Sequence, residues 1–152
     1  MRRTFLRAVV ILLTGMVAGL VVNLGSPRGI PVRTPALIAV PPNQTVTLAE
    51  ARQLLGVAIF FDARRAEDYA LGHIAGAFNL PADDFDAQYP KVAGLLSATG
   101  LVVVYCDGVD CDLSHRVADR LRALGYRQAR ILVNGWTAWR AAGLSTTTGV
   151  TP

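Results

Sequence analysis

The sequence predicts an α/β fold in which helices cover both faces of a mostly parallel sheet. Three short apolar runs, at 57–61, 101–105 and 131–133, have the length and composition of buried strands. Segments with helical spacing separate these runs. Because strand–helix–strand units connect parallel strands through crossovers, this alternation indicates one sheet with helices packed on both sides.

Composition supports a single folded domain. Of the 152 residues, 52% are apolar and 17% charged, which excludes an intrinsically disordered chain. The formal net charge of +4 includes Arg2, Arg3 and Arg7, and without these three the chain has twelve cations against eleven acids. We therefore expect no nucleic-acid partner. Two cysteines exclude a disulfide-dense scaffold and a four-thiolate zinc site, and we expect no metal and no cofactor.

Residues 1–24 have the pattern of a signal anchor or signal peptide. The N-terminal arginines precede residues 8–22, in which Thr14 is the only polar side chain. The wider span 5–24 approaches the length that crosses a bilayer as a helix. No small-x-small cleavage site follows the run, which favours an uncleaved anchor. Positive charge stays in the cytoplasm, so we expect a single-pass inner-membrane protein with its domain in the periplasm or outside. The alternative is secretion to the periplasm after cleavage.

Residues 25–46 are predicted to form an extended tether. They contain five prolines, which lack a backbone N–H and have a fixed φ that discourages helix formation. The apolar stretch 37–40 is a candidate sheet edge within this segment.

The folded domain is expected over 47–145, followed by a C-terminal tail at 146–152. Thr47 and Glu50 have capping-box spacing, which predicts that the first helix starts here. The strand at 57–61 follows Gly56. The later elements are strands at 101–105 and 131–133 and helices at 114–124 and 136–142.

Chemistry in parallel sheets gathers at the carboxyl ends of strands, and this directs attention to Asp62 and Cys106. Cys106 ends one strand and precedes a loop that leads to a helix near Ser114. Loop N–H groups and the positive end of that helix both favour a thiolate at this position. Cys106 is therefore a candidate nucleophile, and the alternative is an inert buried cysteine.

Several motifs resemble those of rhodanese-like domains. They are Asp-Ala-Arg at 62–64, Glu-Asp-Tyr at 67–69, Gly-His-Ile-Ala-Gly-Ala-Phe-Asn-Leu-Pro at 72–81, the strand and cysteine at 102–106, and Asn-Gly-Trp-Thr-Ala-Trp at 134–139. The resemblance covers about 47–143. It implies a three-layer α/β/α fold with a five-stranded sheet, and a catalytic cysteine that holds sulfane sulfur as a persulfide. By position this cysteine is Cys106.

The resemblance also assigns supporting roles outside the loop. Asp62, Arg64 and Glu67 correspond to an ionic network beneath the active site. His73 corresponds to a residue whose hydrogen bonds order a turn. We expect these four residues to support the structure and to take no part in bond breaking.

The cysteine loop departs from the family pattern. It is about two residues longer than the common form and has three carboxylates and no Lys or Arg; its residues after the cysteine are Asp107, Gly108, Val109, Asp110, Cys111, Asp112, Leu113 and Ser114. The carboxylates oppose thiolate formation and repel thiosulfate. The loop therefore favours a neutral or cationic sulfur donor, a small persulfide, or a partner protein's cysteine. Asp112 stands where a related phosphatase needs arginine, which argues against phosphatase activity.

Four residues lie between Cys106 and Cys111, a separation short enough for a disulfide in an oxidising compartment. We consider Cys111 a candidate resolving thiol for a persulfide or sulfenate on Cys106, or a thiol that locks the loop in an inactive state. The alternative is that Cys111 only packs under the loop.

Other residues have simpler expected roles. His115 and the two cysteines have a weak metal pattern. An acidic cluster is expected to cap and solvate a helix start; its members are Asp83, Asp84 and Asp86. Arg116 and Arg120 lie near enough to offset the acidic loop. Trp136 and Trp139 are expected to anchor the last helix to the sheet.

Together these features predict an extracytoplasmic rhodanese-like sulfurtransferase that carries sulfane sulfur as a persulfide on Cys106. Its partners would be a small sulfur donor and a thiol acceptor, with membrane contact through 5–24. The alternative is a non-catalytic rhodanese-fold module that binds a partner or senses redox state through Cys106 and Cys111.

Overall fold

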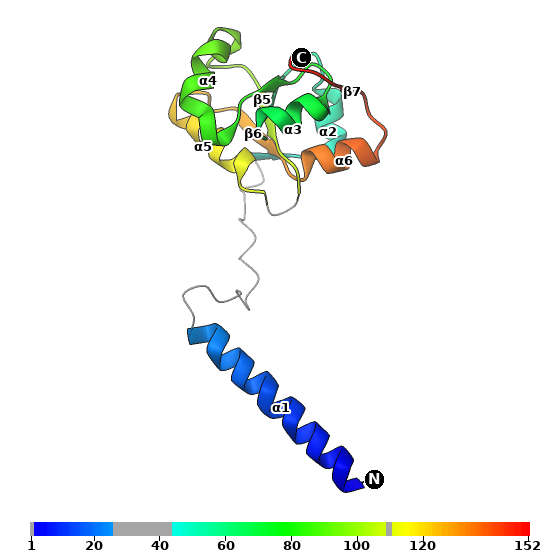
Figure 1. The fold of residues 1–152 in the computed structure, drawn as a ribbon. Coiled ribbons are helices and arrows are strands. Elements are labelled where there is room, and N and C mark those ends of the chain that lie inside the picture. The colour runs from blue at the N-terminus through cyan, green and yellow to red at the C-terminus, as the bar shows by residue number, and fades with distance from the viewer. Residues whose placement is uncertain (1, 26–43, 109–110) are drawn as a thin grey trace. The chain divides into compact units, whose positions relative to one another are not determined.

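The computed structural model describes residues 2–25, 44–108 and 111–152 (Figure 1). Its elements are α1 Arg2–Gly25, β1 Thr45–Val46, α2 Leu48–Gln53, β2 Ile59–Asp62, α3 Ala66–Leu71, β3 His73–Ile74, β4 Phe78–Asn79, η2 Ala82–Asp84, α4 Phe85–Val92, η3 Ala93–Leu95, β5 Val102–Tyr105, α5 Leu113–Ala123, β6 Ala129–Leu132, α6 Gly135–Ala141 and β7 Thr146–Thr147. The chain divides into two units, residues 1–38 and 39–152.

The N-terminal unit contains a single described helix, α1, of 24 residues. Exposed apolar side chains along it include Ile11, Leu12 and Met16. The Thr14 hydroxyl donates to the Val10 carbonyl at 2.9 Å, which satisfies the polar group within the helix. Within the described ranges, no helix meets the combined length and apolarity needed to cross a membrane.

The second unit is built on a five-stranded sheet in the order β1-β6-β5-β2-β4, and every neighbouring pair is parallel. The register pairs Ile59 with Val102 and Val104 with Ile131, so β5 lies at the centre. All four residues of β5 are buried. The predicted five-stranded parallel sheet is confirmed. A separate antiparallel pair joins β3 to β7.

Two apolar clusters lie on opposite faces of this sheet. Val102 and Val104 pack with α4 and α5, whereas Val103 and Tyr105 pack with α2 and α6. Figure 1 shows α4 and α5 together on one side, and α2 and α6 on the other. Alternate residues of a strand point to opposite faces, which explains why a continuous apolar run serves both clusters. The three-layer arrangement is confirmed.

Two strand boundaries differ from the sequence expectation. β2 begins at Ile59, and Val57 lies in the preceding turn with 76% of its surface exposed. β6 begins at Ala129, and Val133 lies beyond its end with 42% exposed. Apolar composition marks a run that can be buried, but the parallel neighbour decides which residues enter the ladder: the Ile59 N–H donates to the Leu101 carbonyl at 3.1 Å.

Two short strands lie just outside the predicted domain bounds of 47–145. β1 lies within 25–46 and pairs with β6, so the last residues of the predicted tether form the edge of the sheet. Gly25 is the last residue of α1, and residues 26–43, including 37–40, lie outside the described residues. β7 lies within the predicted tail 146–152 and pairs with β3. Both strands have only two residues, which is too short for their sequences to predict.

The helix signals correspond to real helix ends. The Glu50 N–H donates to the Thr47 hydroxyl, and the Thr47 N–H donates to the Glu50 carboxylate at 2.7 Å. These backbone and hydroxyl bonds from Thr47 lower the pKa of Glu50. α5 is followed by Gly125 at φ 101, as expected of a glycine beyond a helix end.

Trp139 anchors α6 to the sheet, as its spacing predicted. It is fully buried and meets Phe60 of β2 edge to face, with ring centroids 6.2 Å apart. Its indole N–H donates to the Ser145 carbonyl at 2.9 Å. The tryptophan therefore joins α6, the central sheet and the segment leading to β7.

Candidate active-site cysteine loop

Cys106 directly follows the central strand β5. Hydrogen bonds of the preceding residue Tyr105 and of the Cys106 backbone fix its position. Tyr105 is fully buried, and its hydroxyl accepts the Ile74 N–H at 3.1 Å. The Cys106 carbonyl accepts the Trp136 N–H at 3.1 Å. These bonds hold the cysteine between β3 and the start of α6. Burial, together with the negative charge of Asp62, raises the pKa of Tyr105, so this anchor remains a neutral phenol.

A disulfide joins Cys106 to Cys111, with Cα atoms 6.5 Å apart. The Cys106 side chain is almost completely buried, whereas Cys111 is partly exposed. The Ser114 hydroxyl lies 3.3 Å from the Cys106 Sγ, within hydrogen-bond range for sulfur. The pairing that the sequence left open is therefore present. Val109 and Asp110 lie outside the described residues.

The loop carboxylates do not surround the sulfur evenly. Asp107 is turned toward α6, where its carboxylate accepts a hydrogen bond from the Thr137 hydroxyl. Asp112 is exposed and precedes α5 without a capping bond from its side chain. Gly108 adopts φ 83, a conformation that favours glycine.

A buried ion pair lies beside the loop, formed by Asp62 and Arg64. The Arg64 guanidinium donates to the Asp62 carboxylate at 2.6 Å and to the Gly72 carbonyl at 2.7 Å. It also lies 4.7 Å above the Trp136 ring. Burial opposes the guanidinium charge, but hydrogen bonding and attraction from Asp62 outweigh it and raise the pKa of Arg64. The pair therefore links β2, the turn before β3, and α6.

Glu67 does not belong to this ionic network, and the expectation from the resemblance is corrected here. Its side chain is 78% exposed, and its ion-pair partner is Arg65 at 3.9 Å. Glu67 occupies the first turn of α3 on the solvent side, because the adjoining buried face is occupied by Tyr69. An exposed pair at this distance contributes little to stability.

His73 is completely buried and orders the turn between α3 and β3. Its ring stacks on Tyr69 with centroids 3.7 Å apart, and Nδ1 lies 3.0 Å from the Tyr69 carbonyl. Because a carbonyl only accepts, Nδ1 carries the proton. Nε2 then lacks a hydrogen-bond partner among the described residues.

Two side chains that sequence analysis did not single out help to position the site. The Asn79 amide donates to the carbonyls of Asp62 and Arg64, at 3.1 and 3.0 Å, and so fixes the chain that leaves β2. Thr137 holds Asp107 from the first turn of α6. Both lie within motifs that the resemblance covers, but spacing gives no signal of these contacts.

The arginines of α5 do not offset the loop carboxylates. Arg116 pairs with Asp83 at 2.8 Å, and Arg120 pairs with Asp86. Both acids are exposed to solvent, and through these ion pairs they also join η2 and α4 to α5. The guanidinium of Arg120 also lies 4.4 Å over the Phe85 ring.

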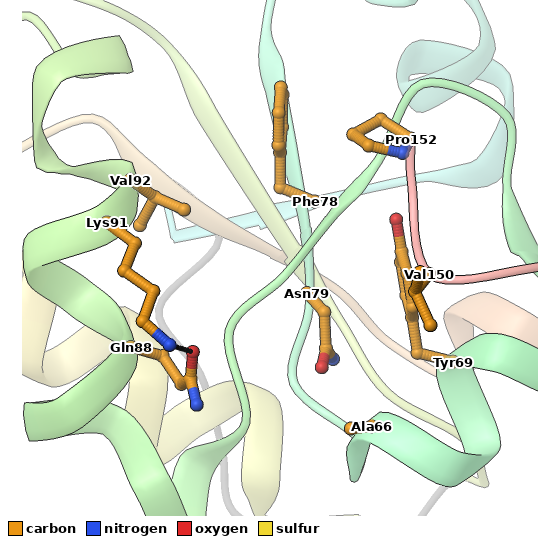
Figure 2. Close-up of a pocket in the computed structure, with 9 residues that line it drawn as sticks. All are labelled: Ala66, Tyr69, Phe78, Asn79, Gln88, Lys91, Val92, Val150 and Pro152. Carbon is orange, nitrogen blue, oxygen red and sulfur yellow. Dashed lines mark hydrogen bonds between the residues drawn. The ribbon is translucent and has the colours of Figure 1, made fainter.

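Among the surface hollows of the domain, two are relevant here, and neither has a cysteine among its lining residues. One, of about 430 Å³, is lined by Arg64, Asp107, Trp136 and Arg140 beside the start of the loop. Figure 2 shows the other, of about 270 Å³, with the hydrogen-bonded Gln88 and Lys91 of α4 on one side and Tyr69 and Val150 on the other. Neither hollow offers a nucleophilic sulfur. The described residues also contain no group of three His, Cys, Asp or Glu side chains able to hold a metal.

Comparison with known proteins identifies the domain. The sequence model of the rhodanese-like domain matches residues 47–142. An HTH-type transcriptional regulator of Mycobacterium tuberculosis is 31% identical over 105 residues, which are 68% of this chain and 44% of the regulator. A tRNA uridine(34) hydroxylase of Salmonella arizonae is 42% identical over 53 residues, 34% of this chain and 15% of the hydroxylase. The chain thus spans less than half the length of these curated relatives.

A solved structure of a single-domain protein also matches. The human single-domain sulfurtransferase superposes with a TM-score of 0.56 at 28% identity. The match covers 64% of this chain and 96% of the human protein. The resemblance therefore extends over nearly the whole of a protein that consists of this domain alone.

Proposed function

Because the chain belongs to the rhodanese-like domain family, we propose that it is a sulfurtransferase that carries sulfane sulfur as a persulfide on Cys106. The observation that carries this proposal is the position of Cys106 at the carboxyl end of the central strand, directly before a loop and α5. The human single-domain sulfurtransferase with the same fold supports it. The reduced protein is the reactive form, since the disulfide occupies both sulfurs.

The reaction has two half-reactions. The Cys106 thiolate attacks the sulfane sulfur of a donor, forms a sulfur–sulfur bond and expels the rest of the donor. Loop N–H groups and the positive end of α5 stabilise the resulting persulfide anion. A thiol acceptor then removes the outer sulfur and regenerates the thiolate.

The donor is proposed to be neutral or cationic. The loop has three carboxylates and no Lys or Arg, and the nearest arginines of α5 are paired with Asp83 and Asp86. An anion such as thiosulfate therefore meets repulsion from the loop carboxylates, and the loop itself supplies no cation to offset it. A small neutral persulfide, or a protein cysteine persulfide, avoids this cost.

Mass spectrometry of the reduced protein tests the proposal. Incubation with a small persulfide should add one sulfur atom to the Cys106 peptide of the Cys111→Ser variant, and thiosulfate should load it more slowly. The Cys106→Ser variant is the matched control and should gain no sulfur. Failure of every donor to load the folded, reduced Cys111→Ser variant would refute the sulfurtransferase proposal, and loading of Cys106→Ser would refute the site assignment.

The second candidate is a non-catalytic module that senses redox state. The observation that favours it is the Cys106–Cys111 disulfide itself. The relative named as a transcriptional regulator, which this chain matches over 44% of its length, is named for a role other than sulfur transfer. This candidate predicts that the Cys106–Cys111 disulfide can be reduced and formed again, while no donor adds a sulfur atom to Cys106.

We further propose that residues 1–24 take the domain out of the cytoplasm, either as a retained inner-membrane anchor or as a signal peptide that is removed. Support comes from the arginine cluster and the apolar run 8–22. A fusion of alkaline phosphatase to the C-terminus of the full chain should be active. Membrane retention after alkaline washing would identify the anchor, and release would identify cleavage. An inactive fusion of normal abundance would contradict export.

A further inference from the structure

We propose that Cys111 resolves the Cys106 persulfide by attacking its inner sulfur, which expels the outer sulfur as hydrosulfide and forms the Cys106–Cys111 disulfide. A dithiol reductant then opens this disulfide through Cys111. The inference rests on the proposed persulfide and adds a second reacting residue, a product and the chemical class of a co-substrate.

The reach of Cys111 identifies the sulfur that it attacks. The Cys111 Sγ is bonded directly to the Cys106 Sγ, with the Cα atoms 6.5 Å apart, so the loop permits contact at the inner position. The outer sulfur of a persulfide lies one bond, about 2 Å, beyond the Cys106 Sγ. Attack at the inner sulfur makes the outer sulfur the leaving group. The loop therefore favours sulfide release over transfer of the sulfur to Cys111.

The atoms and electrons balance without oxygen. The Cys106 persulfide and the Cys111 thiol give the disulfide and one molecule of hydrogen sulfide. The disulfide and a dithiol then give two protein thiols and the oxidised dithiol. Over one turnover the sulfane sulfur accepts two electrons, which the dithiol supplies.

The surroundings of the two sulfurs decide how the disulfide is opened. Only 2% of Cys106 is exposed, whereas Cys111 is partly exposed, so an external thiolate reaches Cys111 first. Cys106 is then the leaving group. The Ser114 hydroxyl, 3.3 Å from its Sγ and itself buried, can donate to the departing thiolate. This order regenerates the nucleophile at Cys106 and places the transient mixed disulfide on Cys111.

A single-turnover experiment tests the resolution step. The full chain is reduced, freed of reductant without oxygen, and given one equivalent of the small persulfide that loads the Cys111→Ser variant. The wild type should release one sulfide for each disulfide formed. Cys111→Ser should retain the added sulfur on Cys106 and release sulfide at least about tenfold more slowly, because an intramolecular attack has been lost.

The outcomes separate the two proposals. A loaded wild-type Cys106 with an alkylatable Cys111 and no sulfide would overturn the resolution step while leaving the sulfurtransferase proposal intact. Equal sulfide release by wild type and Cys111→Ser would also overturn it. Failure of Cys111→Ser to accept sulfur would instead refute the proposed function.

A second measurement tests the order of reduction. Oxidised wild-type protein is treated briefly with glutathione, the mixed disulfide is trapped with acid, and the peptides are analysed by mass spectrometry. Glutathione should be found on the Cys111 peptide. Glutathione predominantly on Cys106 would overturn the proposed entry of electrons through Cys111.

Discussion

At the scale of single residues, the loop is held in place by a glycine that sequence analysis treated only as part of a motif. A Cβ at Gly135 would lie 2.6 Å from the Tyr105 Cβ and 3.1 Å from the Leu132 Cγ. Asn134 directly before it adopts the left-handed conformation, with φ 51. The missing side chain lets α6 approach β5, and this brings the Trp136 N–H to the Cys106 carbonyl. The Asn-Gly-Trp sequence therefore has a packing role at the candidate nucleophile.

Gly135→Ala should destabilise the fold by about 1–3 kcal/mol, because the added methyl group overpacks the buried side chains of Tyr105 and Leu132. Urea unfolding measures this loss, and sulfur loading of Cys106 should slow in parallel. Gly94→Ala is the matched control, since nothing lies within 4 Å of a Cβ there. Equal stability of the two variants would contradict the packing role.

Arg64→Ala should cost about 3–5 kcal/mol, because it leaves the Asp62 carboxylate buried without its cation. The neighbouring Arg65 is 72% exposed and pairs only at 3.9 Å. Arg65→Ala should therefore change the free energy of unfolding by less than about 1 kcal/mol. Denaturant titration of both variants measures the contrast, and a similar loss in both would show that the buried pair has no special role.

At the scale of elements, short helices depend on their ends and their packing. α2 has only six residues, too few to be stable alone. Its capping box fixes its start, and Ala51 is buried in the cluster that also contains Trp139 of α6. α5 also depends on its packing, since its ion pairs with the η2–α4 segment lie at the surface and each contributes little to stability.

Thr47→Ala should destabilise the protein by about 1 kcal/mol, because the Glu50 N–H loses its side-chain acceptor. Thermal or urea unfolding measures the change. Thr151→Ala, at an exposed position near the C-terminus, is the control and should be neutral. An unchanged free energy of unfolding in Thr47→Ala would mean that the capping hydrogen bond stabilises the protein no more than a hydrogen bond to water does.

At the scale of the whole molecule, two tyrosines link stability to alkaline pH. Tyr69 donates its hydroxyl to the Ala77 carbonyl at 2.7 Å, and burial followed by the charge of Asp62 raises its pKa from 10.0 to about 12. The pKa of Tyr105 is also raised, by burial and Asp62. The folded state therefore favours the neutral form of both phenols more than the unfolded chain does.

The free energy of unfolding should be independent of these tyrosines below about pH 10, where the phenols are neutral in both states. Between pH 10 and 12 the unfolded chain ionises more readily, so stability should fall as pH rises. Urea titrations of the oxidised protein at several pH values measure this loss, and native tyrosinate absorbance should lag behind that of the unfolded chain. A constant free energy between pH 10 and 12 would contradict the raised pKa of Tyr69.

Local sequence determined the kinds of elements and the candidate nucleophile. Apolar runs and cap residues indicated the strands and helices, because hydrophobic periodicity and capping act between residues near in sequence. The position of Cys106 after a strand, and of Cys111 within loop reach, followed in the same way. These signals require no knowledge of distant partners.

Only the tertiary structure decided which distant groups meet. It placed Thr45–Val46 in the sheet, set the true start of β2, and separated Glu67 from the Asp62–Arg64 pair. It also brought Thr137 to Asp107 across thirty positions. Ladder hydrogen bonds and buried ion pairs join backbones remote in sequence, and the energy of each contact exists only once the sheet has brought its partners together.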